Sequence, residues 1–246
     1  MTSTHLQLPV HSNHLLAALP NDVLVQLMPH LSTHTIKQGV LLYEAGDEVE
    51  QVYFPHSGMI SLLAVMQNGK VIETATIGRE GVAGAMAGLG LYNSMVRAVV
   101  QLPMVTSRIS AARFRQVAST SRPVENLCIR YNEVLLTQAR LTAACNALHP
   151  VDARFCRWLL QSADRAESST VPLTQELLSE MLGVRRTSVT EVAGRLQREG
   201  FISFSRGVIQ ILDRAALKAM TCECYQSLID HSATLGSPGL AANSAA

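Results

Sequence analysis

Polar side chains suited to base recognition recur at helical spacing between residues 185 and 195. An arginine can donate two hydrogen bonds to guanine O6 and N7, a glutamate can accept from cytosine N4, and Ser or Thr can serve phosphates or bases. The candidate DNA contacts are Arg185, Arg186, Thr187, Ser188, Thr190, Glu191 and Arg195. Arg185 stands where a Ser or Thr cap would be expected, so the helix start lacks about 1 kcal/mol of capping, but the charge suits a phosphate.

These side chains need a helix with one buried side, and the neighbouring apolar residues supply it. The apolar stripe recurs every three or four residues and comprises Val189, Val192, Ala193 and Leu196. A shorter helix precedes it, with Thr174 as its cap and Gly183 at the turn between the two. Residues 201–211 alternate like a hairpin that turns at Arg206-Gly207. This order predicts a winged helix-turn-helix, with Arg206 on the wing as a further DNA contact.

Other interpretations of this segment are open at this point. A small helical bundle with a solvated polar face would show the same pattern. A ligand-binding regulatory protein could instead use the winged helix to contact protein, but such a helix would carry no exposed Arg or Lys. The arginines of this segment therefore favour DNA. We expect no enzyme, because the chain has no Walker loop, no G-x-S-x-G and no H-E-x-x-H motif.

The composition describes a chain long enough for two modest domains. It has 246 residues, of which 48% are hydrophobic and 16% charged. The formal net charge is only +1, so DNA binding must come from local arginines. No apolar run approaches a membrane span, and the N-terminus does not read as a signal peptide, so we expect a cytoplasmic protein. Five cysteines, an odd number at low density, fit a reducing compartment.

Short strand-like runs separated by turns fill residues 33–110 and predict an antiparallel sandwich or barrel. Asn68-Gly69 is the strongest two-residue hairpin signal among them. A segment rich in Gly and Ala interrupts the strands at residues 78–90. Its small side chains would let a ligand approach the backbone, and equally they would suit a crossover packed against the barrel. Candidate ligand contacts here are Gly78, Glu80, Gly81 and Gly84.

A long helix is predicted over residues 124–148, after Pro123 and before His149-Pro150. Apolar residues at alternating steps of four and three suggest the seam of a two-stranded coiled coil. The seam comprises Leu127, Tyr131, Val134, Gln138, Leu141, Cys145 and Leu148. A single buried helix could produce the same pattern. The helix that carries the candidate base contacts is called the reader helix. Together with it, the seam predicts a homodimer on a palindromic operator, with half-sites about 34 Å apart.

The predicted organisation is an α+β fold with four parts. Residues 13–121 form an effector or sensor domain, an antiparallel β-barrel or jelly roll, and residues 122–148 form the dimerisation helix. Residues 149–230 form the winged helix-turn-helix domain, with one last helix after Asp213. Residues 231–246 have low complexity and are predicted to be a disordered tail.

This order of parts resembles the Crp/Fnr family of bacterial transcription regulators over roughly residues 13–212. The most specific match is LTQELLSEMLGVRRTSVTEVAGRLQREGFI, residues 173–202. The resemblance implies a cyclic-nucleotide-binding-like barrel, base reading by Arg186, Thr187 and Glu191, and a phosphate contact by Thr174. It also implies RNA polymerase as a further partner. The family usually has Glu and Arg where this chain has Thr187 and Glu191, so a different operator is expected.

The barrel departs further from the family pattern. The resemblance implies that Arg97 stands where cyclic-nucleotide-binding members hold the phosphate, but Ala98 replaces the Ser or Thr that follows it. No acidic residue occurs from Gly81 to Val96 to accept from a ribose hydroxyl, and Glu80 lies just outside that range. We therefore predict an effector other than cyclic AMP, of unknown nucleotide-like or other type, or a barrel that only supports the dimer.

No cofactor or metal is predicted from the sequence. Cysteine-cluster sensing of the kind found near the N-terminus of oxygen-sensing relatives is excluded, since no cysteine precedes Cys128. Cys222 and Cys224 with His231 nearby offer two thiols and a distant histidine, which is not a complete tetrahedral set. We therefore interpret these cysteines as packing or surface residues.

Overall fold

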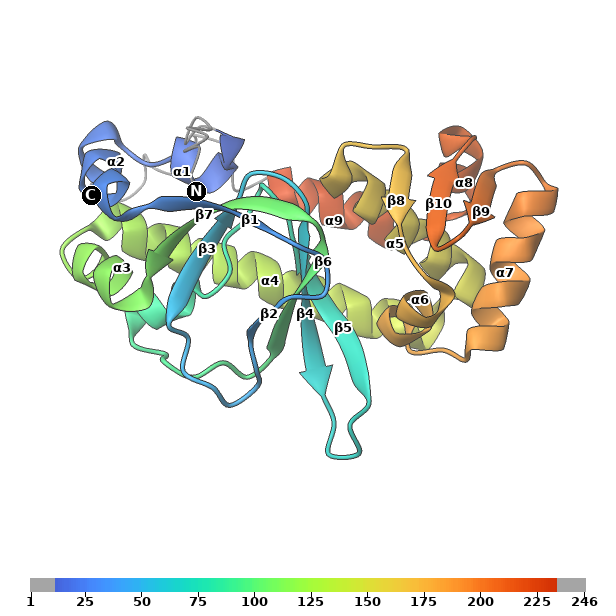
Figure 1. The fold of residues 1–246 in the computed structure, drawn as a ribbon, viewed down its shortest axis with the longest axis horizontal. Coiled ribbons are helices and arrows are strands. Elements are labelled where there is room, and N and C mark those ends of the chain that lie inside the picture. Colours follow the sequence, from blue (N-terminus) through green and yellow to red (C-terminus); the bar gives the residue numbers. More distant parts are fainter. Residues whose placement is uncertain (1–11, 234–246) are drawn as a thin grey trace, which may run out of the picture.

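The computed structural model describes residues 12–233, and seven strands fill the region for which the sequence predicts a sandwich or barrel (Figure 1). They pair antiparallel in two sheets, with strand orders β1-β7-β3 and β2-β6-β4-β5. The strands are β1 (Ser32–Ile36), β2 (Leu41–Tyr43), β3 (Gln51–Pro55), β4 (Met59–Val65), β5 (Val71–Ile77), β6 (Arg97–Leu102) and β7 (Met104–Ser110). The antiparallel fold predicted for this half of the chain is confirmed.

The β4–β5 hairpin forms where it was predicted, but with a different loop. The strands pair up to Val65 and Val71, and the Met66 N–H donates to the Lys70 carbonyl oxygen at 2.8 Å, which leaves residues 67–69 as the loop. Within it the Gly69 N–H donates to the Met66 carbonyl oxygen at 2.9 Å. Gly69 has a φ of +79°, whereas Asn68 does not enter the left-handed region. The glycine thus closes a three-residue loop rather than the two-residue turn that Asn68-Gly69 suggests.

Short helices close the barrel: α1 (His14–Ala17), α2 (Asn21–Leu27), the 3-10 helices η2 (Met28–His30) and η3 (Ala85–Leu89), and α3 (Ala111–Ala118). The Gly-rich segment forms η3, which packs against α3. A Cβ at Gly88 would lie 2.6 Å from the Phe114 ring, and that ring stacks edge-on against Phe54. The packed crossover is therefore the better description of this segment.

The long helix is α4 (Arg122–Leu148), which runs from the barrel to the C-terminal domain (Figure 1). Most of the dimer seam predicted on it is covered by this chain itself. Tyr131, Val134, Gln138 and Cys145 are buried within this chain, Leu127 and Leu141 are half-buried, and Leu148 is exposed beyond the stripe. The apolar stripe covers the barrel and the C-terminal domain, because these surfaces lie alongside the helix and bury it without a second chain.

The C-terminal domain contains the predicted helices and hairpin with one added strand. Its elements are α5 (Val151–Ala166), β8 (Thr170–Pro172), α6 (Gln175–Leu182), α7 (Arg186–Arg198), β9 (Ile202–Ser205), β10 (Val208–Ile211), α8 (Arg214–Met220) and α9 (Cys224–Ala233). The added strand β8 pairs with β10.

The single last helix predicted after Asp213 is in fact two. It breaks at Thr221, whose ψ of 162° is extended. Residues 231–233 still belong to α9, so the predicted tail begins too early; its remainder, residues 234–246, lies outside the described residues. Within residues 12–233, no helix has the length and hydropathy needed to cross a bilayer.

Candidate functional site

The helix-turn-helix has the local geometry that its sequence predicts. The Thr174 hydroxyl accepts from the Leu177 N–H at 3.2 Å and caps α6. Gly183 ends that helix with a φ of +62°, and α7 follows after a short turn. Arg185 is the N-cap of α7 and makes no side-chain capping bond, as expected. Its guanidinium is therefore left at the exposed start of the reader helix.

The outer face of α7 presents the predicted polar set to solvent. Arg185, Arg186, Thr187, Thr190 and Glu191 are exposed and Ser188 is half-buried, while the apolar stripe beneath them is buried. The Thr190 hydroxyl oxygen lies 3.0 Å from both Gln175 Oε1 and the Arg186 carbonyl oxygen. Thr190 is thus partly committed to its own helix pair, whereas the other exposed side chains face outward from the protein.

Arg195 lies differently from the other predicted contacts. Its guanidinium pairs with Asp152, in the first turn of α5, at 2.5 Å. Asp152 holds the pKa of Arg195 above its ordinary value, mainly through their hydrogen bond. Arg195 therefore joins α7 to α5 in this structure, unlike the other predicted DNA contacts.

The wing turns at Arg206-Gly207, as predicted. β9 and β10 pair at Ser205 and Val208, and the two residues between them have φ values of +50° and +73°. Positive φ at both central positions is the geometry of a tight type I′ hairpin. Arg206 is exposed at the tip, where a wing would meet a duplex.

A cavity of about 450 Å³ opens in the barrel between the sheet, η3 and α4. Its size is that of an ordinary small-molecule site. Aliphatic side chains dominate the lining, and α4 contributes Tyr131, Asn132, Leu135, Leu136 and Ala139. Among the described residues that line the cavity, none carries a charge.

Only one of the predicted effector contacts lines this cavity, and that residue is Gly84. The Arg97 guanidinium turns to Glu44, with Nε at 3.0 Å and 2.9 Å from the two carboxylate oxygens. Hydrogen bonds from Arg97 hold the pKa of Glu44 below its ordinary value. Gly78, Glu80 and Gly81 lie outside the lining as well. Arg97 and Glu80 are thus both paired with other residues and lie outside the cavity lining.

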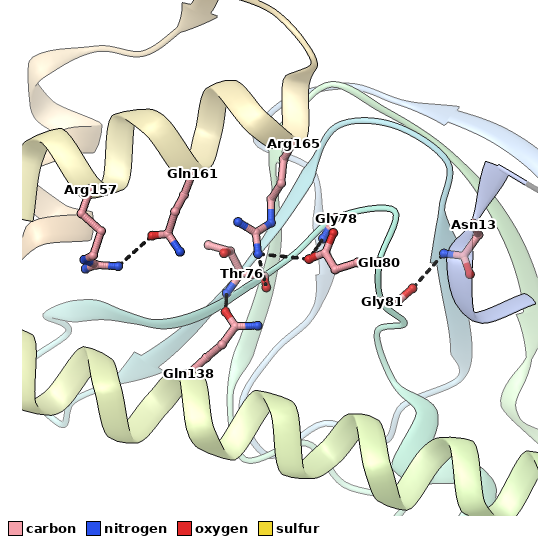
Figure 2. A network of polar contacts seen from close by, with 9 residues as sticks. All are labelled: Asn13, Thr76, Gly78, Glu80, Gly81, Gln138, Arg157, Gln161 and Arg165. Atoms are coloured by element: carbon pink, nitrogen blue, oxygen red, sulfur yellow. Dashed lines mark hydrogen bonds and ion pairs between the residues drawn. The ribbon is translucent and has the colours of Figure 1, made fainter. Parts of the chain in front are cut away.

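Glu80 belongs to the contact between the two domains. One of its carboxylate oxygens lies 3.0 Å from Arg165 of α5 and accepts from the Gly78 N–H at 3.0 Å (Figure 2). Burial alone would raise the pKa of Glu80, but Arg165 and the backbone N–H outweigh it, so the pKa lies below its ordinary value. Beside this pair, Gln138 of α4 accepts from the Thr76 N–H at 3.2 Å.

A second buried carboxyl at the same contact is one that sequence reasoning missed. Glu73 of β5 accepts hydrogen bonds from Ser61 at 2.5 Å and from Trp158 Nε1 at 2.6 Å. Burial raises the pKa of Glu73 to about 7, and the two hydrogen bonds only partly oppose it. Strand alternation places Glu73 on one face of the sheet, but no local sequence pattern shows that α5 covers this face.

Cys222 and Cys224 lie near a histidine other than His231. Cys222 and Cys224 lie with Cys145 and His149, whereas the His231 Nδ1 atom lies 2.7 Å from the Ser227 carbonyl oxygen. Cys145 was assigned to the dimer seam, and its burial on the C-terminal side of α4 replaces that assignment.

Comparison with known proteins identifies both halves of the chain. Residues 33–121 match the family described as cyclic nucleotide-binding domain, and residues 153–220 match the Crp-like helix-turn-helix domain. The two matched ranges fall inside the predicted barrel and reader domains and together cover more than half of the sequence. No curated protein sequence matches this chain.

Solved structures of three regulators share the fold. A CRP-family transcriptional regulator from Thermus thermophilus has a TM-score of 0.64 at 19% identity, covering 76% of this chain and 95% of that one. A CRP/FNR-family regulator from the same organism gives 0.63 at 21% identity, with 77% and 97% covered. The c-di-GMP responsive global regulator CLP of Xanthomonas campestris gives 0.63 at 16% identity, with 78% and 99% covered. With a cyclic nucleotide-binding domain, a long helix and a Crp-like helix-turn-helix in this order, the chain belongs to the Crp/Fnr family of DNA-binding transcription regulators.

Proposed function

We propose that this regulator acts as a homodimer that reads a palindromic operator through α7 and senses an uncharged ligand in the barrel cavity. The observation that carries the proposal is the outer face of α7, where Arg186, Thr187 and Glu191 are exposed together. These three side chains would read bases, while Thr174, Arg185 and Arg206 would contact the DNA backbone. DNA as partner implies action in the cytoplasm, and RNA polymerase completes the proposed set of partners.

The proposed dimer interface is the exposed stripe of α4. Ile129, Leu136 and Ala143 recur every seven residues on the face opposite the buried stripe, and the first two are 52% and 41% exposed. Between them, Glu133 and Arg140 form an ion pair at 2.9 Å. A heptad stripe of this kind pairs with its own copy across a two-fold axis. Two reader helices would then address two half-sites about 34 Å apart.

The effector that the cavity favours is uncharged and largely apolar. A buried phosphate requires a nearby cation, because desolvation of an unpaired charge costs several kcal/mol or more. Arg97 is held by Glu44 outside the cavity, so this chain offers no such cation among the lining residues. An apolar molecule with one or two hydrogen-bonding groups would instead match Tyr131, Asn132 and the aliphatic walls.

Ligand binding in this cavity would bias the dimer directly. Leu136 lines the cavity and also belongs to the exposed stripe of α4. A ligand that contacts it differently in two arrangements of the paired α4 helices shifts their equilibrium by that difference in affinity. The spacing of the two reader helices would change accordingly.

The experiment that tests the proposed function is selection of binding sites from random DNA duplexes at several salt concentrations. The full chain is used alone, with cyclic AMP and with cyclic di-GMP. We expect one palindromic site to be enriched, with no effect of either anionic nucleotide. Enrichment that requires a nucleotide would contradict the uncharged cavity. No enrichment in any arm would favour a winged helix that contacts protein.

Arg186→Ala should cost about 1–3 kcal/mol at one base pair of each half-site and relax the specificity there. Arg185→Ala is the matched control, since it removes the neighbouring charge from a proposed phosphate contact. It should weaken binding to all sequences alike and reduce the salt slope by about one. Dissociation constants on the operator and its single-base variants measure both effects. Equal weakening on every sequence by Arg186→Ala would show that Arg186 reads no base.

Arg97→Ala should leave DNA binding and any effector response unchanged, because Glu44 already holds the guanidinium outside the cavity lining. Glu44→Ala is the control, since it releases Arg97 without removing it. Operator binding and ligand-dependent melting temperature measure the outcome. An effector response lost in Arg97→Ala and retained in Glu44→Ala would indicate an anionic ligand.

A further inference from the structure

Three thiols and one imidazole from separate segments converge where α4 meets the C-terminal helices. Cys145 lies in the last turn of α4, and His149 directly follows that helix. Cys222 lies between α8 and α9, and Cys224 begins α9. The three Sγ atoms and a ring nitrogen of His149 all lie within 4.8 Å of one another. All three cysteines are buried, and the His149 side chain is 20% exposed.

The separations fit a tetrahedral ion. The Cys145 and Cys222 Sγ atoms are 3.5 Å apart, and the Cys224 Sγ atom lies 3.7 Å from His149 Nδ1. Zinc bonds of about 2.3 Å to sulfur and about 2.0–2.1 Å to nitrogen place tetrahedral ligands about 3.5–3.8 Å from each other. These two ligand pairs thus already have the spacing of opposite edges of a zinc tetrahedron.

His149, the fourth member of the cluster, is also oriented as a metal-binding histidine should be. Its Nε2 atom lies 3.2 Å from Glu223 Oε1, and Glu223 stands between the two C-terminal cysteines in sequence. A carboxylate that accepts the Nε2 proton leaves the Nδ1 lone pair free to face the thiols. Metal-binding histidines in proteins usually have such a partner, which sets both the tautomer and the ring orientation.

The charges around the cluster suit a divalent cation held by thiolates. Zn²⁺ with three thiolates and a neutral imidazole carries a net charge of −1. Arg154 and Arg157 are buried beside the cluster, and they interact electrostatically with Cys145. A cation among the three thiols would stabilise them as neighbouring thiolates, because coordination deprotonates a thiol directly.

We propose that Cys145, His149, Cys222 and Cys224 bind one Zn²⁺ ion in a closed tetrahedral site. Four protein ligands leave no open coordination position, so the site is structural rather than catalytic. A disulfide between Cys145 and Cys222 is the competing arrangement. It would leave the Cys224 thiol and the oriented His149 ring without a function.

The position of the site gives the ion a mechanical role. Cys145 and His149 flank the end of α4, immediately before Pro150 and α5, while Cys222 and Cys224 hold the start of α9. Zinc therefore ties the junction between the two domains to the C-terminal helices. If the proposed DNA-binding function is correct, loss of zinc loosens the reader relative to α4 and weakens operator binding. The metal site itself does not depend on that function.

The test is metal analysis of the full chain, purified in reducing buffer with added zinc and then dialysed. We expect about one Zn²⁺ per chain. After replacement by Co²⁺, the protein should show the visible absorption of tetrahedral, thiolate-bound cobalt. A metal-free protein, an iron–sulfur chromophore, or a Cys145–Cys222 disulfide under these conditions would each overturn the assignment.

Variants separate the ligands from the other cysteines. Cys145→Ser and Cys222→Ser should lose the bound zinc, whereas Cys156→Ala, at a buried cysteine outside the cluster, should keep it. Glu223→Gln removes no ligand and changes an exposed side chain, so it should fold and still lose about 10–100-fold in zinc affinity. Zinc content that is equal in Cys145→Ser and Cys156→Ala would overturn the proposal. DNA binding is measured separately, so a failure of the proposed function remains distinguishable.

Discussion

Leu136→Asp is expected to convert the proposed homodimer into a monomer and to weaken binding to the full operator by about 10²–10⁴-fold. Leu136 stands at the centre of the exposed stripe of α4, where a carboxylate would face its own copy across the two-fold axis. The monomer must bind each half-site alone and loses the gain in affinity that comes from joining two DNA-binding domains in one dimer. Light scattering gives the mass in solution, and titration with full and half operators gives the affinities.

Two further variants make the dimer prediction specific. Ala143→Asp lies on the same stripe but does not line the barrel cavity, so it should also give a monomer without touching a ligand. Val25→Asp places the same charge at a 65% exposed valine of α2 and should leave the dimer intact. A dimer that survives both α4 substitutions would place the interface on another surface.

Glu73→Gln is expected to remove about 3 kcal/mol of pH dependence from the free energy of unfolding. Burial raises the pKa of Glu73 to about 7, whereas the unfolded chain has the ordinary value of 4.5. Below about pH 4.5, Glu73 is protonated in both the folded and the unfolded state, so its ionisation does not change the free energy of unfolding. As the pH rises toward 7, only the unfolded state ionises, so the wild type loses stability. Above pH 7 the loss is complete, and the neutral amide of the Glu73→Gln variant avoids it.

Urea unfolding at pH 5 and pH 8 measures this difference, and fluorescence reports the contact itself. Trp158 donates to the Glu73 carboxyl and is the only tryptophan in the sequence. Its emission should titrate with a midpoint near pH 7 in the wild type and not in Glu73→Gln. Glu199→Gln, at an exposed glutamate of the reader domain, controls for the loss of one carboxylate. Parallel stability curves for wild type and Glu73→Gln would contradict the prediction.

The helix-turn-helix could be predicted closely because its signals are local. A cap at Thr174, a glycine at residue 183 and an apolar stripe on α7 all act within one or two helical turns. The wing turn at Arg206-Gly207 is equally local, since positive φ at two neighbouring residues suffices to form it. Backbone geometry of this kind depends little on the rest of the chain.

The side of α4 that faces a partner could not be predicted in the same way. A heptad stripe indicates that an apolar surface is buried, but it does not identify the surface that covers it. Here Tyr131 and Val134 are covered by the barrel, and the shorter heptad stripe through Ile129 and Leu136 is left exposed. The pattern is the same for an internal contact and for a dimer, since both bury the same kind of surface.

Short-range patterns therefore establish the order of elements, the antiparallel barrel, the reader helix and its exposed chemistry. The pairing of distant side chains is decided only by the tertiary structure. Arg97 meets Glu44 across 53 positions, Trp158 meets Glu73 across 85, and Cys145 meets Cys222 across 77. No periodicity spans such separations, because the packing of whole elements, and not the spacing of residues, brings these groups together. The uncharged cavity, the titrating domain contact and the proposed zinc site all arise from that packing.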